Sequence, residues 1–224
     1  MKKRRSTLIL IILLPFIPVI MYATKIGKTL EYKTIDWRFR VRGESLVSEN
    51  VFIAAMDDYS IDLIGRWPWR RGIIGSFINT LSVLPPQQMV LDILYTETSA
   101  DFPIDDRLLA GASARNGRVY FPFLSLLGAP VFGIESLDDM LDPVKEIMLK
   151  SSLGKVEDYP EVDFIDAQTV LPPISQFAQV AKNSGYVNSE PDSDGVNRRI
   201  PLLMKMDGYI FPYLGLSAAL DYLD

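Results

Sequence analysis

The stretch VFIAAMDD (51–58) decides the predicted fold. Its first six residues form an apolar run, as expected of a strand covered on both faces. Apolar residues then recur at helical spacing from Ile74 to Leu84, until two prolines end the predicted helix. A second apolar run, residues 89–95, is interrupted only by Asp92. Strand, helix and strand within about 45 residues predict a βαβ unit with a right-handed crossover.

In such a unit, the loops that follow the strands meet at one edge of the sheet, where small ligands usually bind. Acidic, aromatic and basic side chains are expected near this edge. They are Asp57, Asp58, Trp67, Trp69, Arg71 and Glu97. Together they predict a polar, aromatic-lined crevice, without indicating what fills it.

Composition excludes several kinds of chemistry. The 224 residues contain no cysteine, which rules out disulfides, thiol catalysis, iron–sulfur clusters and cysteine zinc sites. They also contain no histidine, the usual general base and the commonest metal ligand. Neither a P-loop nor a glycine-rich dinucleotide motif is present, so no cofactor and no metal are predicted.

Net charge argues against nucleic acid as a partner. The chain carries −5 overall, but residues 1–24 hold four basic and no acidic residues. The remaining 200 residues therefore have 19 basic against 28 acidic side chains, a net charge of −9. A body this acidic is repelled by phosphate backbones.

The N-terminus predicts a membrane anchor. Leu8 to Ala23 is free of charge and follows four basic residues, and residues 7–24 as a helix would span about 27 Å. We therefore predict two parts, an anchor at residues 1–24 and a body at residues 25–224. The alternative is a cleaved signal peptide, although residues 21–24 (MYAT) lack a small-residue cleavage pattern.

The leading basic cluster predicts a cytoplasmic N-terminus, and hence a single-pass protein of the inner membrane with a periplasmic body. After the anchor we expect a helix from Lys25, followed by a strand over residues 36–42. The strand would turn Trp37, Phe39 and Val41 inward and three arginines outward. Those arginines suit either a strip for anionic headgroups or a solvated edge strand, and the latter is favoured.

Further patterns continue the alternation of helices and strands. One helix is predicted to begin after Asp105, its N-cap, and to end at Asn116-Gly117. Three more helices are predicted, at 143–151, from Pro172 or Pro173 to Asn183-Ser184-Gly185, and at 212–223. Strands are predicted at 118–124, from Tyr186, at 200–206 and at 209–211, the last two joined by Asp207-Gly208. The predicted fold is α/β, with a mixed, largely parallel sheet flanked by helices and an appended antiparallel hairpin.

Five stretches in order then resemble one family. They are DWRFR (36–40), IAAMDD (53–58), GRWPW (65–69), LDILYTE (91–97) and DSDGVNRRIPL (192–202). Over roughly residues 30–220 the chain resembles the CHASE domains of the second type, which are extracytoplasmic sensory domains of bacterial receptors. The resemblance implies an output through a cyclase, a diguanylate cyclase or a histidine kinase, and dimerisation through the juxtamembrane helix.

The chain departs from the family pattern in three ways. Arg70-Arg71 stands where the family usually has Pro then Arg, and Ile74 stands where it often has His, which puts a shared ligand in doubt. In the family, more membrane spans and a cytoplasmic output domain follow, whereas this chain stops at Asp224. We expect a receptor's sensor half, a truncated product, or an input subunit that works with a separate partner.

Two acidic features have competing interpretations. Asp57 and Asp58 suit either a cation or ligand amine, or the cap of a short helix starting near Tyr59. Asp92 within an apolar strand is costly unless it is paired. Its predicted partner is Arg71, Arg198 or Arg199, as a structural ion pair or as part of a ligand contact.

Two loops likewise have functional and structural interpretations. Glu190, Asp192 and Asp194 suggest a calcium loop, but Pro201 stands where the twelfth position needs Glu, so a tight turn is predicted. Trp67-Pro68-Trp69 suits an aromatic wall for a ligand or a loop pinned to the core.

The sequence therefore predicts a membrane-anchored sensor of an unknown small ligand, without an active site. Ligand binding is expected to shift residues 25–32 relative to the last helix. The alternatives are a scaffold that binds a partner protein, and a hydrolase pairing Asp57 with Asp92 or Glu97, a pair that nothing in the sequence selects.

Overall fold

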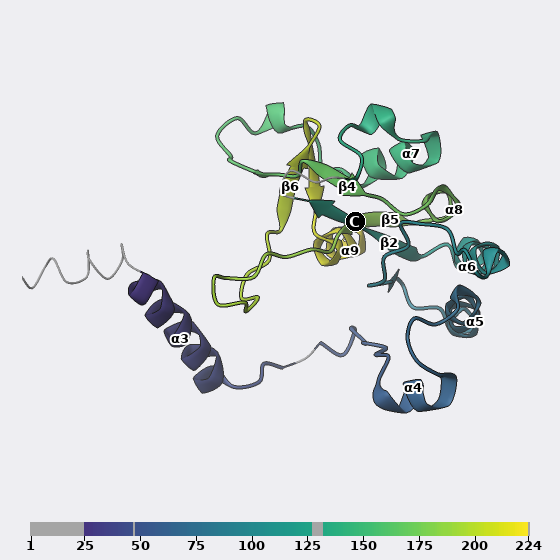
Figure 1. The fold of residues 1–224 in the computed structure, drawn as a ribbon, viewed down its shortest axis with the longest axis horizontal. Coiled ribbons are helices and arrows are strands. Elements are labelled where there is room, and N and C mark those ends of the chain that lie inside the picture. The colour runs from purple at the N-terminus through teal and green to yellow at the C-terminus, as the bar shows by residue number, and fades with distance from the viewer. Residues whose placement is uncertain (1–24, 47, 127–131, 224) are drawn as a thin grey trace, which may run out of the picture. The chain divides into compact units, whose positions relative to one another are not determined.

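A computed structural model describes residues 25–46, 48–126 and 132–223 (Figure 1). Its contacts divide the chain into two compact units, residues 1–56 and residues 57–224. The predicted anchor, residues 1–24, lies outside the described residues. Among the helices that the structure does describe, none combines the length and the apolar character that a bilayer crossing requires.

The first unit contains one long helix, α3 (Lys25–Arg42). The predicted strand over residues 36–42 is therefore wrong. Contacts along the helix explain why the helix continues: Arg38 Nε donates to the carbonyl of Thr34, and the Arg42 guanidinium lies 4.6 Å from the centre of the Phe39 ring. Such contacts between residues three and four apart stabilise helices and are unavailable to a strand.

Residues 51–56 also differ from the prediction. The structure assigns no strand there, and Phe52 and Ile53 are almost fully exposed. An apolar run forms a strand only where a neighbouring strand offers hydrogen bonds. Among the described residues, none pairs with this segment. The predicted first strand, and with it the predicted βαβ unit, is wrong.

The second unit holds a sheet organised around β2 (Val119–Leu126). β1 (Met89–Val90) and β5 (Asn183–Tyr186) pair with β2 in parallel, and β4 (Thr169–Leu171) pairs antiparallel with its far end. Met89 lies opposite Val119, Phe123 opposite Tyr186, and Leu124 opposite Leu171. The mixed α/β class is confirmed, and the βαβ unit that forms is β1–α6–β2.

A second, smaller sheet contains β3 (Ile165–Asp166), β6 (Leu203–Met206) and β7 (Tyr209–Pro212). β3 and β6 are parallel, and β6 and β7 form the predicted hairpin. Asp207 and Gly208 both have positive φ, 49° and 77°, as a two-residue turn between twisted strands requires.

The helices of the second unit largely follow the predicted order. They are α4 (Asp58–Ile64), α5 (Arg71–Leu81), α6 (Pro103–Asn116), α7 (Asp142–Ser151), α8 (Ser175–Ala178) and α9 (Leu214–Leu223), with 3-10 turns η1 (Leu137–Asp139) and η2 (Val156–Asp158). Gly117 ends α6 as predicted, at φ 68°. Asp105 is not its N-cap, because Pro103 starts the helix two residues earlier.

Residues 183–185 were predicted as a helix end and instead belong to β5. α8 is a single turn, so the chain returns to the sheet sooner than expected.

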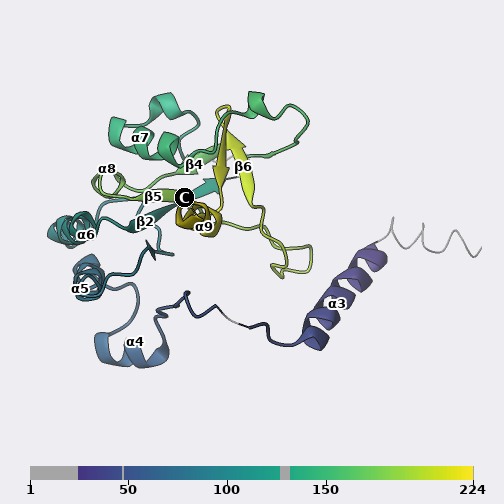
Figure 2. The ribbon, with the colours of Figure 1, turned by 180° about the vertical axis from the view of Figure 1, so that it is seen from behind.

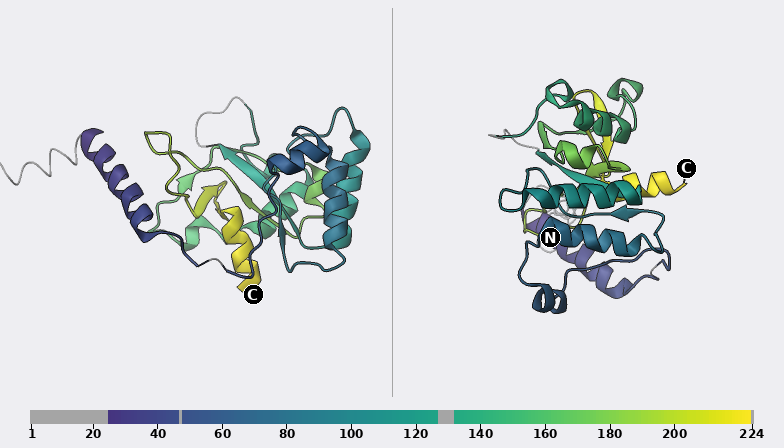
Figure 3. Two further views of the ribbon diagram at one scale, coloured as in Figure 1. Left: turned by 90° about the horizontal axis from the view of Figure 1, so that it is seen from below. Right: turned by 90° about the vertical axis from the view of Figure 1, so that its right-hand side faces the viewer.

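The core lies on both sides of β2. Phe121 packs with Ile78, Leu109 and Phe177 beneath α5 and α6, which lie side by side (Figure 3). Phe123, two residues further along β2, has its side chain on the same face and packs in a second cluster. Its neighbours there include Tyr186, Met148, Met204 and Phe211. Tyr120 points to the opposite face of β2, where it packs with Leu214 and Ala218 of α9, so α9 covers one face of the strand and the two larger clusters lie along the other.

The last helix is tied to the sheet by packing and by polar contacts. α9 packs against β5 and β7 (Figure 2). Ser217 Oγ donates to the Ser184 carbonyl at 2.7 Å. The Tyr120 hydroxyl donates to the carboxylate of Asp221, which also pairs with Lys182 at 3.1 Å. α9 therefore cannot slide along β5 without breaking buried hydrogen bonds.

Gly185 permits this close approach, because a Cβ there would stand 2.6 Å from Leu214 Cα. We expect Gly185→Ala to destabilise the fold by about 1–3 kcal/mol through overpacking against backbone. The matched control is Gly111→Ala within α6, where a Cβ meets only the flexible end of Arg115 at 3.4 Å. That change should be neutral, or stabilising by up to about 1 kcal/mol. Urea unfolding measures both, and equal effects would contradict the packing.

Candidate functional site

Two adjacent arginines at the start of α5 face two adjacent aspartates in the first turn of α6. Gly75 allows the two helices to approach closely, since a Cβ there would lie 3.2 Å from the Leu108 carbonyl oxygen. Arg70 makes a bidentate ion pair with Asp105, Nε to Oδ2 at 3.0 Å and a terminal nitrogen to Oδ1 at 2.9 Å. Asp105 is 1% exposed, whereas the Arg70 side chain is 51% exposed. The buried carboxylate thus keeps its counter-charge at the surface.

Arg71 is more deeply placed and makes more contacts. One terminal nitrogen lies 2.6 Å from Asp106 Oδ1, and the other donates to the Glu97 carbonyl at 2.8 Å. The other oxygen of Asp106 accepts the Ser99 amide at 3.0 Å. The side chains of Arg71 and Asp106 are 14% and 3% exposed. We call Arg71, Asp106 and the loop residues Glu97 and Ser99 the Arg71 joint, because they tie the loop after β1 to two helices.

An aromatic floor supports this joint. The Arg71 guanidinium lies 5.0 Å from the Tyr95 ring centre and 5.7 Å from that of Phe177. Phe177 stacks on Phe121 of β2 at 5.0 Å. Burial raises the pKa of Tyr95 to about 12, so its hydroxyl stays protonated at neutral pH. The arginine charge therefore rests on the core, where cation–π attraction adds to the ion pair.

The tryptophan loop divides into one anchored and one exposed ring. Trp69 Nε1 donates to the Gly65 carbonyl at 2.6 Å, and its ring packs against the core beneath α5. Trp67 meets Trp69 edge-on at 6.1 Å and stays 45% exposed. Trp69 thus pins the loop, as the structural interpretation predicted, and Trp67 is available for contact.

Asp57 is the N-cap of α4, which confirms the capping interpretation for one of the two aspartates. Its carboxylate accepts hydrogen bonds from the Ser60 hydroxyl and from the Ser60 amide. These bonds lower the pKa of Asp57. Asp58 is the first residue of the helix and is exposed.

Asp92 does not occupy the buried position that was predicted. β1 ends at Val90, so Asp92 lies beyond the ladder and its side chain is exposed. Its predicted partners pair elsewhere, Arg71 with Asp106 and Arg198 with Asp192 and Asp194. Glu97 contributes its carbonyl to Arg71, and its side chain is exposed. The prediction from the apolar run 89–95 was therefore too long, because the strand contains only Met89 and Val90.

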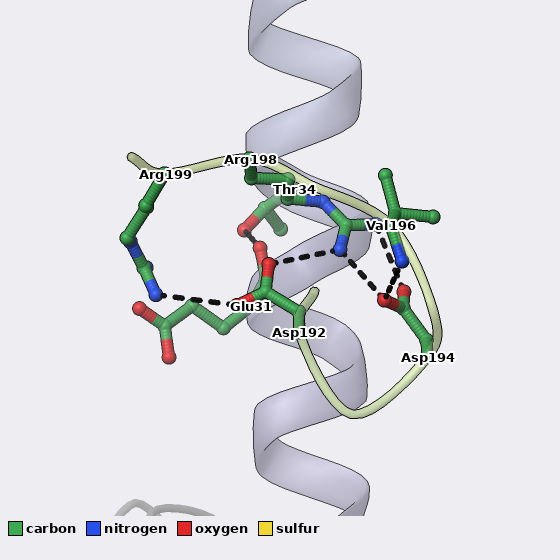
Figure 4. Close-up of polar contacts among 7 residues, drawn as sticks. All are labelled: Glu31, Thr34, Asp192, Asp194, Val196, Arg198 and Arg199. Atoms are coloured by element: carbon green, nitrogen blue, oxygen red, sulfur yellow. Dashed lines mark hydrogen bonds and ion pairs between the residues drawn. The ribbon is translucent and has the colours of Figure 1, made fainter. Parts of the chain in front are cut away.

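Arg198 and Arg199 belong to a separate loop, drawn in Figure 4. Arg198 is nearly buried and pairs with Asp192 at 3.1 Å and with Asp194 at 2.8 Å, while Arg199 lies 3.7 Å from Asp192. Asp194 also accepts the Val196 amide, as in the predicted turn with Asx bonds, and Gly195 has φ 82°. Hydrogen bonds from Arg198 lower the pKa of Asp194.

Arg198 thus forms ion pairs with Asp192 and Asp194, the carboxylates that the calcium interpretation assigned to the ion. Elsewhere in the described ranges, no cluster of three or more acidic side chains is close enough to hold a metal.

The predicted residues therefore do not gather at a single edge. Trp69, Arg71 and the main chain of Glu97 lie around the start of α5, whereas the loop that carries Arg198 and Arg199 leads into β6 of the second sheet, and that loop lies away from α5 (Figures 1 and 3). Sequence reasoning missed Arg70, Asp105 and Asp106. The sequence did contain a signal. A doublet of arginines, Arg70-Arg71, stands near the start of one predicted helix, and a doublet of aspartates, Asp105-Asp106, stands at the start of the next.

The joint should be a large determinant of stability. We expect Arg71→Ala to cost about 3–5 kcal/mol of unfolding free energy, because Asp106 would stay buried without its counter-charge. The control is Lys145→Ala, which removes an exposed pair with Asp138 and should cost no more than about 1 kcal/mol. Urea unfolding at neutral pH compares them, and an Arg71 effect no larger than the control would refute the role of the joint.

The pair of Arg70 and Asp105 predicts a dependence on pH. Hydrogen bonds from Arg70 lower the pKa of Asp105 below its unfolded value, so its stabilisation exists at neutral pH and is lost in acid. Asp105→Asn should therefore be less stable than the original chain above about pH 5, and the difference should shrink as pH falls below about 4. Unfolding curves across pH test this, and a constant difference would contradict it.

A family model described as CHASE2 domain matches residues 7–224. No curated protein and no solved structure matches the chain. Because the match covers nearly the whole sequence, the chain belongs to the CHASE2 domain family of extracellular sensory domains.

Proposed function

We propose that this chain is the periplasmic input domain of a bacterial receptor, held in the inner membrane by residues 7–24 and presenting residues 25–224 outside the cytoplasm. The observation that carries the proposal is the CHASE2 match, because that family consists of sensory domains. The acidic body and the absence of cysteine agree with it. The output would be a cyclase, a diguanylate cyclase or a kinase, on the same receptor or on a separate partner.

We propose that the ligand is small and is contacted by the exposed members of the predicted set. Arg71, Trp69 and Asp57 already make structural contacts, whereas Asp58, Trp67, Asp92 and Glu97 expose their side chains. Carboxylates and an indole ring are suited to a cationic ligand such as an amine. Arg199, on the second loop, is exposed and stays in the proposed set, whereas Arg198 is nearly buried and already paired with Asp192 and Asp194.

Signalling requires that the ligand bind two arrangements of the domain with different affinity. The proposed path leads from the loop after β1 through the Arg71 joint to the sheet, and from the sheet to α9. The contacts of α9 with Ser184 and Tyr120 support this path, since they couple the last helix to β5 and β2.

A thermal-shift screen with small amines and other metabolites tests the proposal. A ligand at a hundredfold excess over its Kd should raise Tm by about 5–10 °C. Glu97→Gln should abolish that shift and leave the ligand-free Tm unchanged, since this side chain is exposed. Trp67→Ala should also abolish the shift, and it should lower the ligand-free Tm slightly because the ring contact with Trp69 is lost. Glu161→Gln, on a different loop, is the control. A screen without any shift, together with a protein partner captured in vivo, would favour the scaffold alternative.

A further inference from the structure

α3 presents an exposed apolar stripe. Leu30, Trp37 and Val41 are 44%, 64% and 65% exposed. At 3.6 residues per turn, these three positions fall within about 40° of one another around the helix axis. The predicted strand would have turned Trp37, Phe39 and Val41 to the same side, whereas the helix places Phe39 about 160° from Val41. The stripe is thus a property of the helix that the strand pattern did not show.

Basic side chains border this stripe on both sides. Around the helix, Lys33 and Arg40 lie about 60–80° from its centre on one side, and Arg38 lies about 80° away on the other. All three are exposed. The two acidic residues of the helix, Glu31 and Asp36, lie at least about 100° away. Apolar residues are therefore flanked by cations, with the anions set back.

The charge of α3 is opposite to that of the rest of the body. Six basic and two acidic residues give the helix +4, whereas residues 43–224 carry −13. A second copy of α3 is a poor partner for the stripe, because the flanking cations of the two copies would come together and repel one another. An anionic surface with an apolar interior complements both features.

We propose that α3 lies along an anionic lipid surface, with Leu30, Trp37 and Val41 at the boundary between headgroups and acyl chains. Lys33, Arg38 and Arg40 then reach the lipid phosphates while their stems cover the apolar edge. Tryptophan is the side chain best suited to that boundary. This inference rests on the proposed anchor, since residues 7–24 would bring α3 next to the membrane.

The test uses the full chain with Trp67→Phe and Trp69→Phe, which leaves Trp37 as its one tryptophan. The chain is reconstituted into vesicles of phosphatidylcholine alone, or with phosphatidylglycerol, that carry lipids brominated near the headgroup end of the chain. We expect Trp37 to be quenched and blue-shifted when phosphatidylglycerol is present. Arg38→Gln with Arg40→Gln should weaken this surface binding on the order of thirtyfold.

A matched pair of variants tests which face of the helix is buried. Val41→Asp places an acid in the stripe and should abolish the quenching of Trp37. Phe39→Asp places the same acid on the opposite side and should leave it intact. Equal effects of the two would overturn the assignment of the stripe.

Two further outcomes separate this inference from the proposed function. Flotation with neutral vesicles combined with an unquenched Trp37 in both lipids would overturn the inference and leave the anchor standing. A chain that floats only with phosphatidylglycerol and shows quenched Trp37 would support the inference and refute the anchor. Cross-linking of Val41→Cys between two copies, with Trp37 unquenched by lipid, would overturn the inference in favour of a second copy.

Discussion

The structure depends on one buried ion pair that joins α5 to α6 and to the loop that precedes α6. Arg71 opens α5, Asp106 stands in the first turn of α6, and the loop after β1 reaches both through Glu97 and Ser99. A guanidinium on an aromatic floor is tolerable only if its charge and its donors are satisfied. Asp106 supplies the charge, and the Glu97 carbonyl takes a donor that would otherwise be orphaned. The pair therefore fixes where the loop lies relative to the two helices.

This constraint changes what the charged motifs can do. Several side chains that looked available for recognition contribute to the fold, and Arg198 is likewise enclosed by Asp192 and Asp194. Recognition is left to the exposed residues of the same loops, Trp67 and Glu97 among them. In a sensory domain this division has a physical advantage. The buried pairs hold the loops in place, so ligand contacts on their surface do not also have to organise them.

Local chemistry explains which elements the sequence could predict. The Asp207-Gly208 turn and the helix end at Gly117 could be predicted because positive φ favours those residue types. The strand predicted over residues 36–42 was wrong because alternating aromatic and basic residues fit a helix as well as a strand. The strand predicted over residues 51–56 and the buried position predicted for Asp92 were wrong because strand pairing depends on a distant partner, which an apolar run does not reveal. The Arg71 joint depends on the same long-range geometry, although its charges were visible in the sequence.

Hydrogen exchange at the Ser99 amide tests whether the Arg71 joint holds the loop against α5 and α6, because this amide donates to Asp106 and lies in a loop. We predict that this amide is protected and that it opens together with the amides of α5 and α6, with the same free energy of opening. An amide at Ser99 that exchanges at the rate of an unstructured loop, while both helices stay protected, would contradict it.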